Sequence, residues 1–278
     1  MTTIAEITKT VIDHRFELAR LGQGSRATVL VSQRRARPIV AAIGTMQVNR
    51  ITRSALEIYC AQRAAAGIAH TTVNQEMSFL QTVLRSAQAD GVPVSLTSTP
   101  RLKVEAIEKP IPMANAVAKV LELLPAHHAD AMRFMATTGI SPHELERVAP
   151  CDISSQGLHI GQRGGFKVKV AARRRIVPLN KQAREIAVRA MTGRKPEEPM
   201  FPRRGATAKA LSLVQAREGE RISPKTMRSL FASMVAMTEP EHILQPLLGH
   251  SPGSPTTRRH YTRSNLASLG QAVSGIAL

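Results

Sequence analysis

The clearest pattern of hydrophobic and polar positions lies in the stretch TTVNQEMSFLQTVLRSAQADG, residues 71–91. Its apolar residues recur every three or four positions, as expected for one face of a helix. They are Val73, Met77, Leu80, Leu84 and Ala87. Thr72 and Gln75 have the spacing of a capping box, and Gly91 suits a helix end. We therefore predict an amphipathic helix over this stretch.

Comparable patterns predict further helices along the chain. They cover residues 51–67, 113–124, 128–138 and 223–237, and helical periodicity returns after residue 181. Two of the predicted helix starts carry a Ser-Pro pair, Ser141-Pro142 and Ser223-Pro224. Serine suits the N-cap and proline the first helical position. Glu144 completes a capping box with the first of these serines.

Two stretches depart from helical periodicity. Residues 92–112 are rich in Pro, Ser and Thr, which is typical of a linker. Residues 152–180 combine a Gly pair, β-branched residues and rough alternation, which favours a small antiparallel sheet. The sequence thus predicts a mainly α protein with a small antiparallel β-sheet. We expect a helical domain at 1–100, a linker at 101–112 and a second domain at 113–278.

Charge points to the kind of partner. The 278 residues include 38 Lys or Arg against 20 Asp or Glu, a net charge of +18. No acidic residue lies between residues 153 and 184, where eight are Lys or Arg, and none lies after residue 241. Such tracts indicate surfaces that face phosphates, hence a nucleic-acid partner. Aromatic residues make up only 3% of the chain, which argues against RNA recognition by base stacking.

Other features of the sequence indicate the cellular compartment. Cys60 and Cys151 have no metal-binding or redox spacing, so we expect reduced thiols and no metal site. The first residues lack the layout of a signal peptide, and no apolar run approaches 18 residues. We therefore expect a cytoplasmic protein with no membrane partner.

The order of four motifs carries a family resemblance. They are TTGISPHELERVAPCDI (137–153), RRRIVPL (173–179), SPKTMRSLFAS (223–233) and LLGHSPGSPTTRRHYTR (247–263). In this order they resemble the catalytic boxes of the tyrosine recombinase (phage integrase) family. Residues 43–87 resemble the helical, SAM-like core-binding domain that precedes them. The resemblance implies a catalytic-type domain over 113–278 with a C-terminal helix, in a DNA-associated protein of bacterial or phage origin.

The resemblance also implies a chemistry. The family cuts a DNA strand by attack of a tyrosine phenolate on the scissile phosphate, leaving a 3′-phosphotyrosyl bond, and it needs no metal or cofactor. Two arginines normally clamp the phosphate oxygens, because their planar forks match phosphate geometry. A lysine protonates the leaving oxygen, and histidines assist proton transfer.

Several residues match that site. Tyr261 matches the nucleophile, and its alternative Tyr59 lies on the apolar face of a predicted helix. Arg228 matches the second clamp arginine, and His250 matches the histidine of the last box. The spacing from His250 to Tyr261 is about two residues longer than the family pattern.

The lysines are less closely fixed. Lys225 stands where the third motif usually has histidine, a replacement that the family tolerates. Lys169 is the choice for the hairpin lysine and Lys167 is the alternative, because the loop before RRRIVPL is one residue longer than usual.

One position departs from the pattern. Serine occupies position 141, where the family has its first clamp arginine. Ser141 can cap a helix and donate one hydrogen bond, but it carries no charge. Loss of such an arginine costs roughly 10³–10⁵ in rate, so we expect cleavage to be impaired or absent. Three explanations stay open: catalysis has been lost, another basic residue such as Arg133 or Arg147 replaces the arginine, or the serine is engineered.

DNA binding does not depend on that residue. The expected phosphate contacts are Arg163, Lys167, Lys169, Arg173, Arg174 and Arg175 in the hairpin tract, and Arg258, Arg259 and Arg263 beside the tyrosine. The apolar tail at 264–278 packs either on a neighbouring protomer or on its own domain. The first case implies a homodimer or tetramer on double-stranded DNA.

Three functions fit these observations. The first is site-specific recombination or integration. The second is a noncatalytic DNA-binding regulator, accessory or segregation factor, which Ser141 favours. The third is a nickase that uses the same tyrosine.

Overall fold

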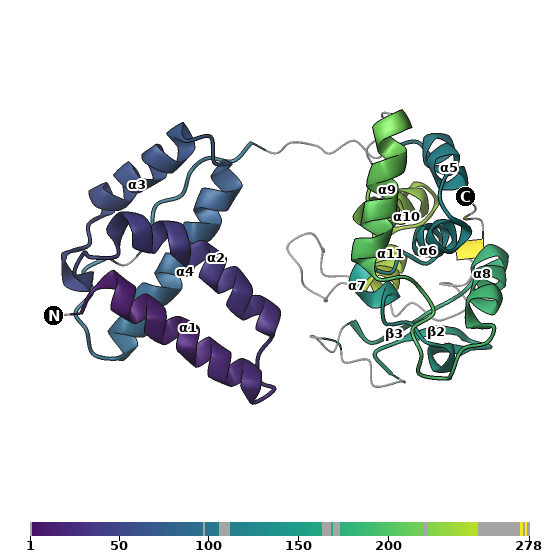
Figure 1. Cartoon of the computed structure of the whole chain (residues 1–278), viewed down its shortest axis with the longest axis horizontal. Coiled ribbons are helices and arrows are strands. Elements are labelled where there is room, and N and C mark those ends of the chain that lie inside the picture. Colours follow the sequence, from purple (N-terminus) through teal and green to yellow (C-terminus); the bar gives the residue numbers. More distant parts are fainter. Residues whose placement is uncertain are drawn as a thin grey trace. The chain divides into compact units, whose positions relative to one another are not determined.

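The structure is a computed structural model that describes residues 2–96, 98–105, 112–162, 168, 173–218, 222–249, 273, 274 and 276. The chain divides into two compact units, Met1–Glu108 (unit 1) and Lys109–Leu278 (unit 2), shown in Figure 1. Each unit has its own hydrophobic core. Among the described residues, no helix is long and apolar enough to span a bilayer.

Unit 1 is helical. Its elements are α1 (Ile4–Arg20), α2 (Arg26–Ile43), a 3₁₀ turn η1 (Val48–Arg50), α3 (Arg53–Ala65) and α4 (His70–Ala89). Helix α4 packs against the three other helices, and the side chains of Met77 and Leu80 are fully buried, as the periodicity predicted. A capping box between Thr3 and Glu6 begins α1.

The predicted cap of α4 is wrong. The helix begins at His70, with Ala69 as its N-cap, so Thr72 lies within the first turn. Gly67, with a φ of 77°, turns the chain after α3 and brings Ala69 into the N-cap position with a ψ of 134°. The backbone reversal at Gly67, and not the capping preference of Thr72, sets the start of α4.

After α4 the chain runs back along the same helix. Asn74 accepts a hydrogen bond from Leu102 N at Oδ1 (2.8 Å) and donates from Nδ2 to Leu102 O (2.9 Å). Thr99 N donates to Gln81 Oε1 at 2.8 Å. The apolar side chains of this return segment (residues 92–96 and 98–103) pack on the core of unit 1; they are Val92, Val94, Leu96 and Leu102. The first residues of the predicted linker at 101–112 are therefore held by α4.

A buried polar cluster joins α3 to α4. Tyr59 Oη donates to Glu76 Oε2 at 2.8 Å, and Arg63 Nη2 lies 2.7 Å from Glu76 Oε1. Burial raises the pKa of the Tyr59 phenol, and the hydrogen bond to Glu76 raises it further. Tyr59 is thus a core residue held in its protonated form.

Unit 2 surrounds a small sheet with helices. Its helices are α5 (Ala114–Glu122), α6 (Ala126–Thr138), α7 (Pro142–Leu145), α8 (Lys181–Met191), α9 (Arg204–Glu218), α10 (Pro224–Thr238) and α11 (Glu241–Leu248), with a 3₁₀ turn η2 (Pro150–Asp152). Its strands are β1 (Ile153–Ser154), β2 (Gly157–Ile160) and β3 (Arg175–Val177). Helix α6 packs against α8 and α10, and its Phe134 and Met135 are fully buried. The predicted fold class, mainly α with a small antiparallel sheet, is confirmed.

The strand register decides which hairpin residue is buried. The strands pair antiparallel in the order β1-β2-β3, with Leu158 opposite Val177 and Ile160 opposite Arg175. Directly opposed residues point to the same face of a sheet. Because Leu158, Ile160 and Val177 are fully buried, the side chain of Arg175 enters the interior with them.

The described residues near the C-terminus lie against unit 2 itself. Val273 and Ile276 are buried with side chains of α10 and α11. Asn180 Nδ2 donates to Val273 O at 3.2 Å and to Ile276 O at 2.5 Å. The positions of Val273 and Ile276 fit the alternative in which the tail packs on its own domain.

Candidate functional site

The site is built around the corner between α6 and α7. Helix α6 ends at Thr138, and its C-cap Gly139 has a φ of 66°. Ser141 is the N-cap of α7: its Oγ accepts from Glu144 N at 3.3 Å, and its own N–H donates to Glu144 Oε2 at 2.7 Å. The predicted capping box, with Pro142 at the first helical position, is confirmed. A Cβ on Gly139 would lie 2.3 Å from Phe231 Cδ1, so α10 packs directly on this corner.

A buried ion pair fastens α7 to β3. Arg175 Nη1 lies 2.8 Å from Glu144 Oε1, and Nη2 lies 3.2 Å from Oε2. Arg175 Nε also donates to Leu247 O in α11 at 2.8 Å. The Arg175 side chain is only 6% exposed. The expectation that Arg175 contacts DNA phosphate is therefore corrected: its donors bind groups inside the unit.

The carboxylate of Glu144 stays ionised at any ordinary pH. Burial alone would raise its pKa, but the hydrogen bonds and charge of Arg175 act in the opposite direction. The N–H of Ser141 and the charge of Arg228 add to that effect, and the pKa of Glu144 falls to about 2. One fixed anion therefore organises α7, β3 and α10.

Arg228 is the third group on this anion. From α10, its Nη1 donates to Gly139 O at 2.8 Å and lies 3.6 Å from Glu144 Oε2, while Nη2 donates to Leu248 O at 2.5 Å. Burial lowers the pKa of Arg228 to about 10, although Glu144 opposes the shift. Arg228 is thus a cation at neutral pH, and its fork is fixed by two main-chain carbonyls.

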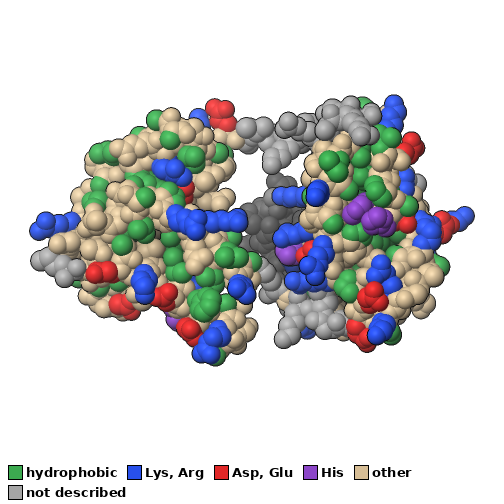
Figure 2. Space-filling model, viewed as in Figure 1, with side chains coloured by type: hydrophobic (Ala, Val, Ile, Leu, Met, Phe, Trp, Pro, Cys, Tyr) green, Lys and Arg blue, Asp and Glu red, His purple; other side chains and the backbone are tan. Residues whose placement is uncertain are grey.

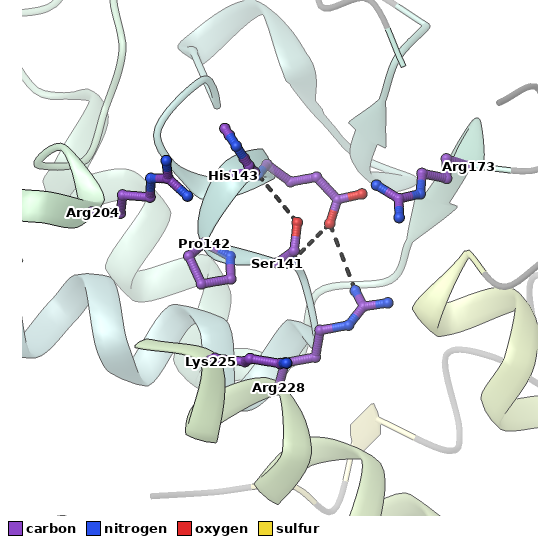
Figure 3. A pocket seen from close by; sticks show the side chains of 8 residues that line it. Ser141, Pro142, His143, Arg173, Arg204, Lys225 and Arg228 are labelled. Atoms are coloured by element: carbon purple, nitrogen blue, oxygen red, sulfur yellow. Dashed lines mark hydrogen bonds and ion pairs between the residues drawn. The ribbon is translucent and has the colours of Figure 1, made fainter. Parts of the chain in front are cut away.

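These groups border a pocket of about 390 Å³. Its lining residues are Ser141, Pro142, His143, Glu144, Arg173, Arg204, Lys225 and Arg228. Figure 3 shows the guanidinium groups of Arg173 and Arg204 on opposite sides of Ser141, with Arg228 on a third side. Lys and Arg side chains also gather over α7 on the surface of unit 2 in Figure 2. Four cationic side chains face one carboxylate that is already paired, so the pocket is suited to an anion.

The structure brings together part of the predicted site. Ser141, Arg173, Lys225 and Arg228 line one pocket although up to 87 residues separate them in the sequence. Arg174 is exposed and is not a lining residue. The other predicted residues lie outside the described part of the chain: Tyr261, His250, Lys169, Lys167, Arg163, Arg258, Arg259 and Arg263.

Sequence reasoning missed Arg204 and His143 as lining residues. Neither Arg133 nor Arg147, the expected replacements for the missing arginine, lines the pocket. The signal for Arg204 was the basic pair Arg203-Arg204 within the region of helical periodicity after residue 181, but the sequence alone gave no reason to place this pair beside Ser141. Within the described ranges, no group of His, Cys, Asp and Glu has a metal-binding arrangement.

Solved structures that share this fold include integrases bound to DNA. The integrase of transposon Tn1549, in complex with circular intermediate DNA, has a TM-score of 0.72 at 16% identity, over 91% of this chain and 93% of that one. A lambda integrase tetramer on a Holliday junction has a TM-score of 0.70 at 16% identity, over 94% of this chain and 81% of that one. Lambda integrase bound to DNA has a TM-score of 0.66 at 16% identity, over the full length of both chains. No protein-family profile and no curated protein sequence matches the chain. At these identities, the similarity establishes the fold.

Proposed function

We propose that this protein is a member of the tyrosine recombinase family that binds a specific site in double-stranded DNA. Its reaction is site-specific recombination or integration through a 3′-phosphotyrosyl intermediate at Tyr261, with cleavage impaired by Ser141. The observation that carries the proposal is the cationic pocket around Ser141, on a fold shared with DNA-bound integrases. We place its activity on DNA in the cytoplasm of a bacterium, as part of a phage or other mobile element.

The pocket suits the scissile phosphate. Arg228 uses two of its five N–H groups on carbonyls, which leaves others for phosphate oxygens. Lys225, one turn earlier on α10, lines the same pocket and can donate to the same group. Donors that are fixed before the substrate arrives stabilise developing charge most effectively.

Ser141 sets the expected level of activity. Its hydroxyl already accepts the N–H of Glu144, so it serves α7 as a cap and brings no charge to the pocket. Removal of one oxyanion donor costs about 10²–10³ in rate, and removal of an arginine on a phosphoryl group costs roughly 10³–10⁵. We therefore assign slow cleavage with retained DNA binding.

A second candidate rests on the same serine. A noncatalytic integrase-fold protein that binds DNA as a regulator, accessory or segregation factor would need the phosphate contacts but no first arginine. It differs from the enzyme in forming no covalent bond to DNA.

Charge on unit 1 supports a DNA partner for that unit too. Helix α2 contains no acidic residue, and its Arg34 and Arg37 are exposed. Figure 2 shows Lys and Arg side chains over this helix. We assign α2 to the DNA interface, together with the exposed Arg173 and Arg174 of the hairpin tract in unit 2.

We also propose assembly on DNA as a dimer or tetramer through the C-terminal helix. The lambda integrase structures include a dimer on a core site and a tetramer on a Holliday junction. Val273 and Ile276 of this chain occupy an apolar site beside α10 and α11, and in the proposed assembly the tail of a neighbouring protomer takes that site.

The deciding experiment is a denaturing gel of the protein after incubation with supercoiled DNA from its own genetic neighbourhood, with Tyr261→Phe alongside. The proposal predicts a weak, slowly migrating covalent species that is absent from the Phe variant. Tight salt-dependent binding without that species would select the noncatalytic candidate. Absence of both would reject the proposed function.

A further inference from the structure

Ser141 leaves one side of the pocket without its expected charge. Lys225 and Arg228 both come from α10, and Arg173 lies close enough to Arg228 that its charge helps lower the pKa of Arg228. An anion held only by these three groups would be bound from the side of α10 and β3. The opposite side of Ser141 is formed by His143 and by the first residue of α9, Arg204.

The guanidinium group of Arg204 is available to bind an anion. Its one ion pair with a described residue joins Nε to Glu146 Oε2 at 4.0 Å, the outer limit of such a contact. The terminal Nη1 and Nη2 form no hydrogen bond within the described ranges, and the side chain is 55% exposed. Arg175, by contrast, is 6% exposed and donates to groups inside the unit from all three of its nitrogens.

Glu146 approaches Arg204 on its Nε side. This carboxylate is at the C-terminal end of α7 and lies 3.0 Å from His143 Nδ1. Its Oε2 lies 4.0 Å from Nε of Arg204, and neither Nη group takes part in this ion pair. Figure 3 shows the Arg204 guanidinium directed toward Ser141 from the side opposite Arg173. A guanidinium so presented can bind a phosphate through two parallel N–H···O bonds.

We propose that Arg204 supplies the second guanidinium on the phosphate group in this pocket, in place of the arginine that Ser141 lacks. The proposal rests on the proposed function for the identity of the phosphate as part of DNA. It also makes a claim about the pocket alone: a phosphate group binds there through Arg204 and Arg228 from opposite sides.

The test uses inorganic phosphate and thermal unfolding of the full chain, with chloride at matched ionic strength as the reference. We expect phosphate at about ten times its Kd to raise the Tm of the wild type by roughly 3 °C. Arg204→Ala should remove most of that shift. The matched control is Arg203→Ala, because Arg203 is exposed beside Arg204 and does not line the pocket; it should retain the full shift. The double variant Ser141→Arg/Arg204→Ala should regain the shift.

Each result has a single meaning. A full phosphate shift in Arg204→Ala, an equal loss in Arg203→Ala, or no recovery in a folded double variant would each overturn the proposal. If the double variant does not fold, the comparison of the two single alanine variants still decides. Binding of a DNA duplex is measured on the same proteins. A phosphate shift that depends on Arg204 without duplex binding would reject the proposed function alone, and duplex binding with an unchanged shift would reject this inference alone.

Discussion

Glu144 and Arg175 form a two-point ion pair in the interior of unit 2, at 2.8 Å and 3.2 Å. The same carboxylate caps the N–H of Ser141 and faces Arg228. One buried anion therefore sets the relative positions of α7, β3 and α10, the elements that Ser141 caps and that carry Arg175 and Arg228. The geometry of the pocket depends on a residue whose own charge is neutralised by its partners.

Glu144→Gln should destabilise unit 2 strongly. The substitution leaves the guanidinium of Arg175 buried without an anion, and loss of one partner of a buried pair typically costs 3–5 kcal/mol. Urea unfolding followed by circular dichroism measures the effect. The control is Glu185→Gln on the exposed face of α8, which should change stability by no more than about 0.5 kcal/mol. Equal effects of the two variants would contradict a central role for the pair.

Acid should remove the same stabilisation. The pKa of Glu144 is about 2 in the folded chain against an ordinary value of 4.5, so the folded state favours the ionised form. Its contribution, roughly 3 kcal/mol, is complete above pH 4.5 and is lost as the pH falls toward 2. Urea midpoints measured from pH 6 to pH 2 should fall more steeply for the wild type than for Glu144→Gln. Parallel curves would show that other carboxylates dominate acid unfolding.

Neighbouring arginines of the hairpin tract should behave differently. Arg175→Gln should lower stability by several kcal/mol, because it removes the partner of a buried carboxylate. Arg174→Gln, at an exposed position, should leave stability unchanged. If Arg174 contacts DNA, that variant should weaken duplex binding and reduce the salt slope by about one. A stable Arg175→Gln, or an unchanged salt slope for Arg174→Gln, would contradict the corresponding assignment.

Gly139 offers a test of the corner itself. Its φ is 66°, and a Cβ there would lie 2.3 Å from the ring of the fully buried Phe231. Gly139→Ala should therefore combine backbone strain with overpacking and cost about 3 kcal/mol. Gly193 has a φ of 75° with nothing within 4 Å of the added Cβ, so Gly193→Ala isolates the backbone part at about 1 kcal/mol. Equal losses of stability would show that α10 yields to the added methyl group.

Much of the fold could be predicted from local signals. The helical spacing of Val73, Met77 and Leu80 correctly predicted the buried face of α4. A helix that is buried on one side has apolar residues every three or four positions. The Ser141 and Ser223 caps were also correct, since a cap involves only residues within one turn. The cap at Thr72 failed because the chain turns at Gly67 and α4 begins earlier, with Ala69 as its N-cap, and the capping pattern does not encode that turn.

The pocket could be predicted only in part. Motif order selected Ser141, Lys225 and Arg228, which do line it. It could not distinguish the exposed Arg174 from the buried Arg175, because that difference depends on a one-residue strand register. Arg204 belongs to none of the motifs and reaches the pocket through packing of α9 beside α7.

The return segment of unit 1 determines where the protein can be divided. The side chains of Asn74 and Gln81 form hydrogen bonds with residues 99–102, and Leu102 packs on the core of unit 1. A fragment that ends with α4 would therefore expose apolar side chains of the core and leave the side-chain amides of Asn74 and Gln81 without these partners. A fragment that retains residues through 105 keeps these contacts. Chimaeras that exchange unit 1 between relatives should therefore be joined after residue 105, so that each helical module carries its own return segment as part of the exchangeable piece.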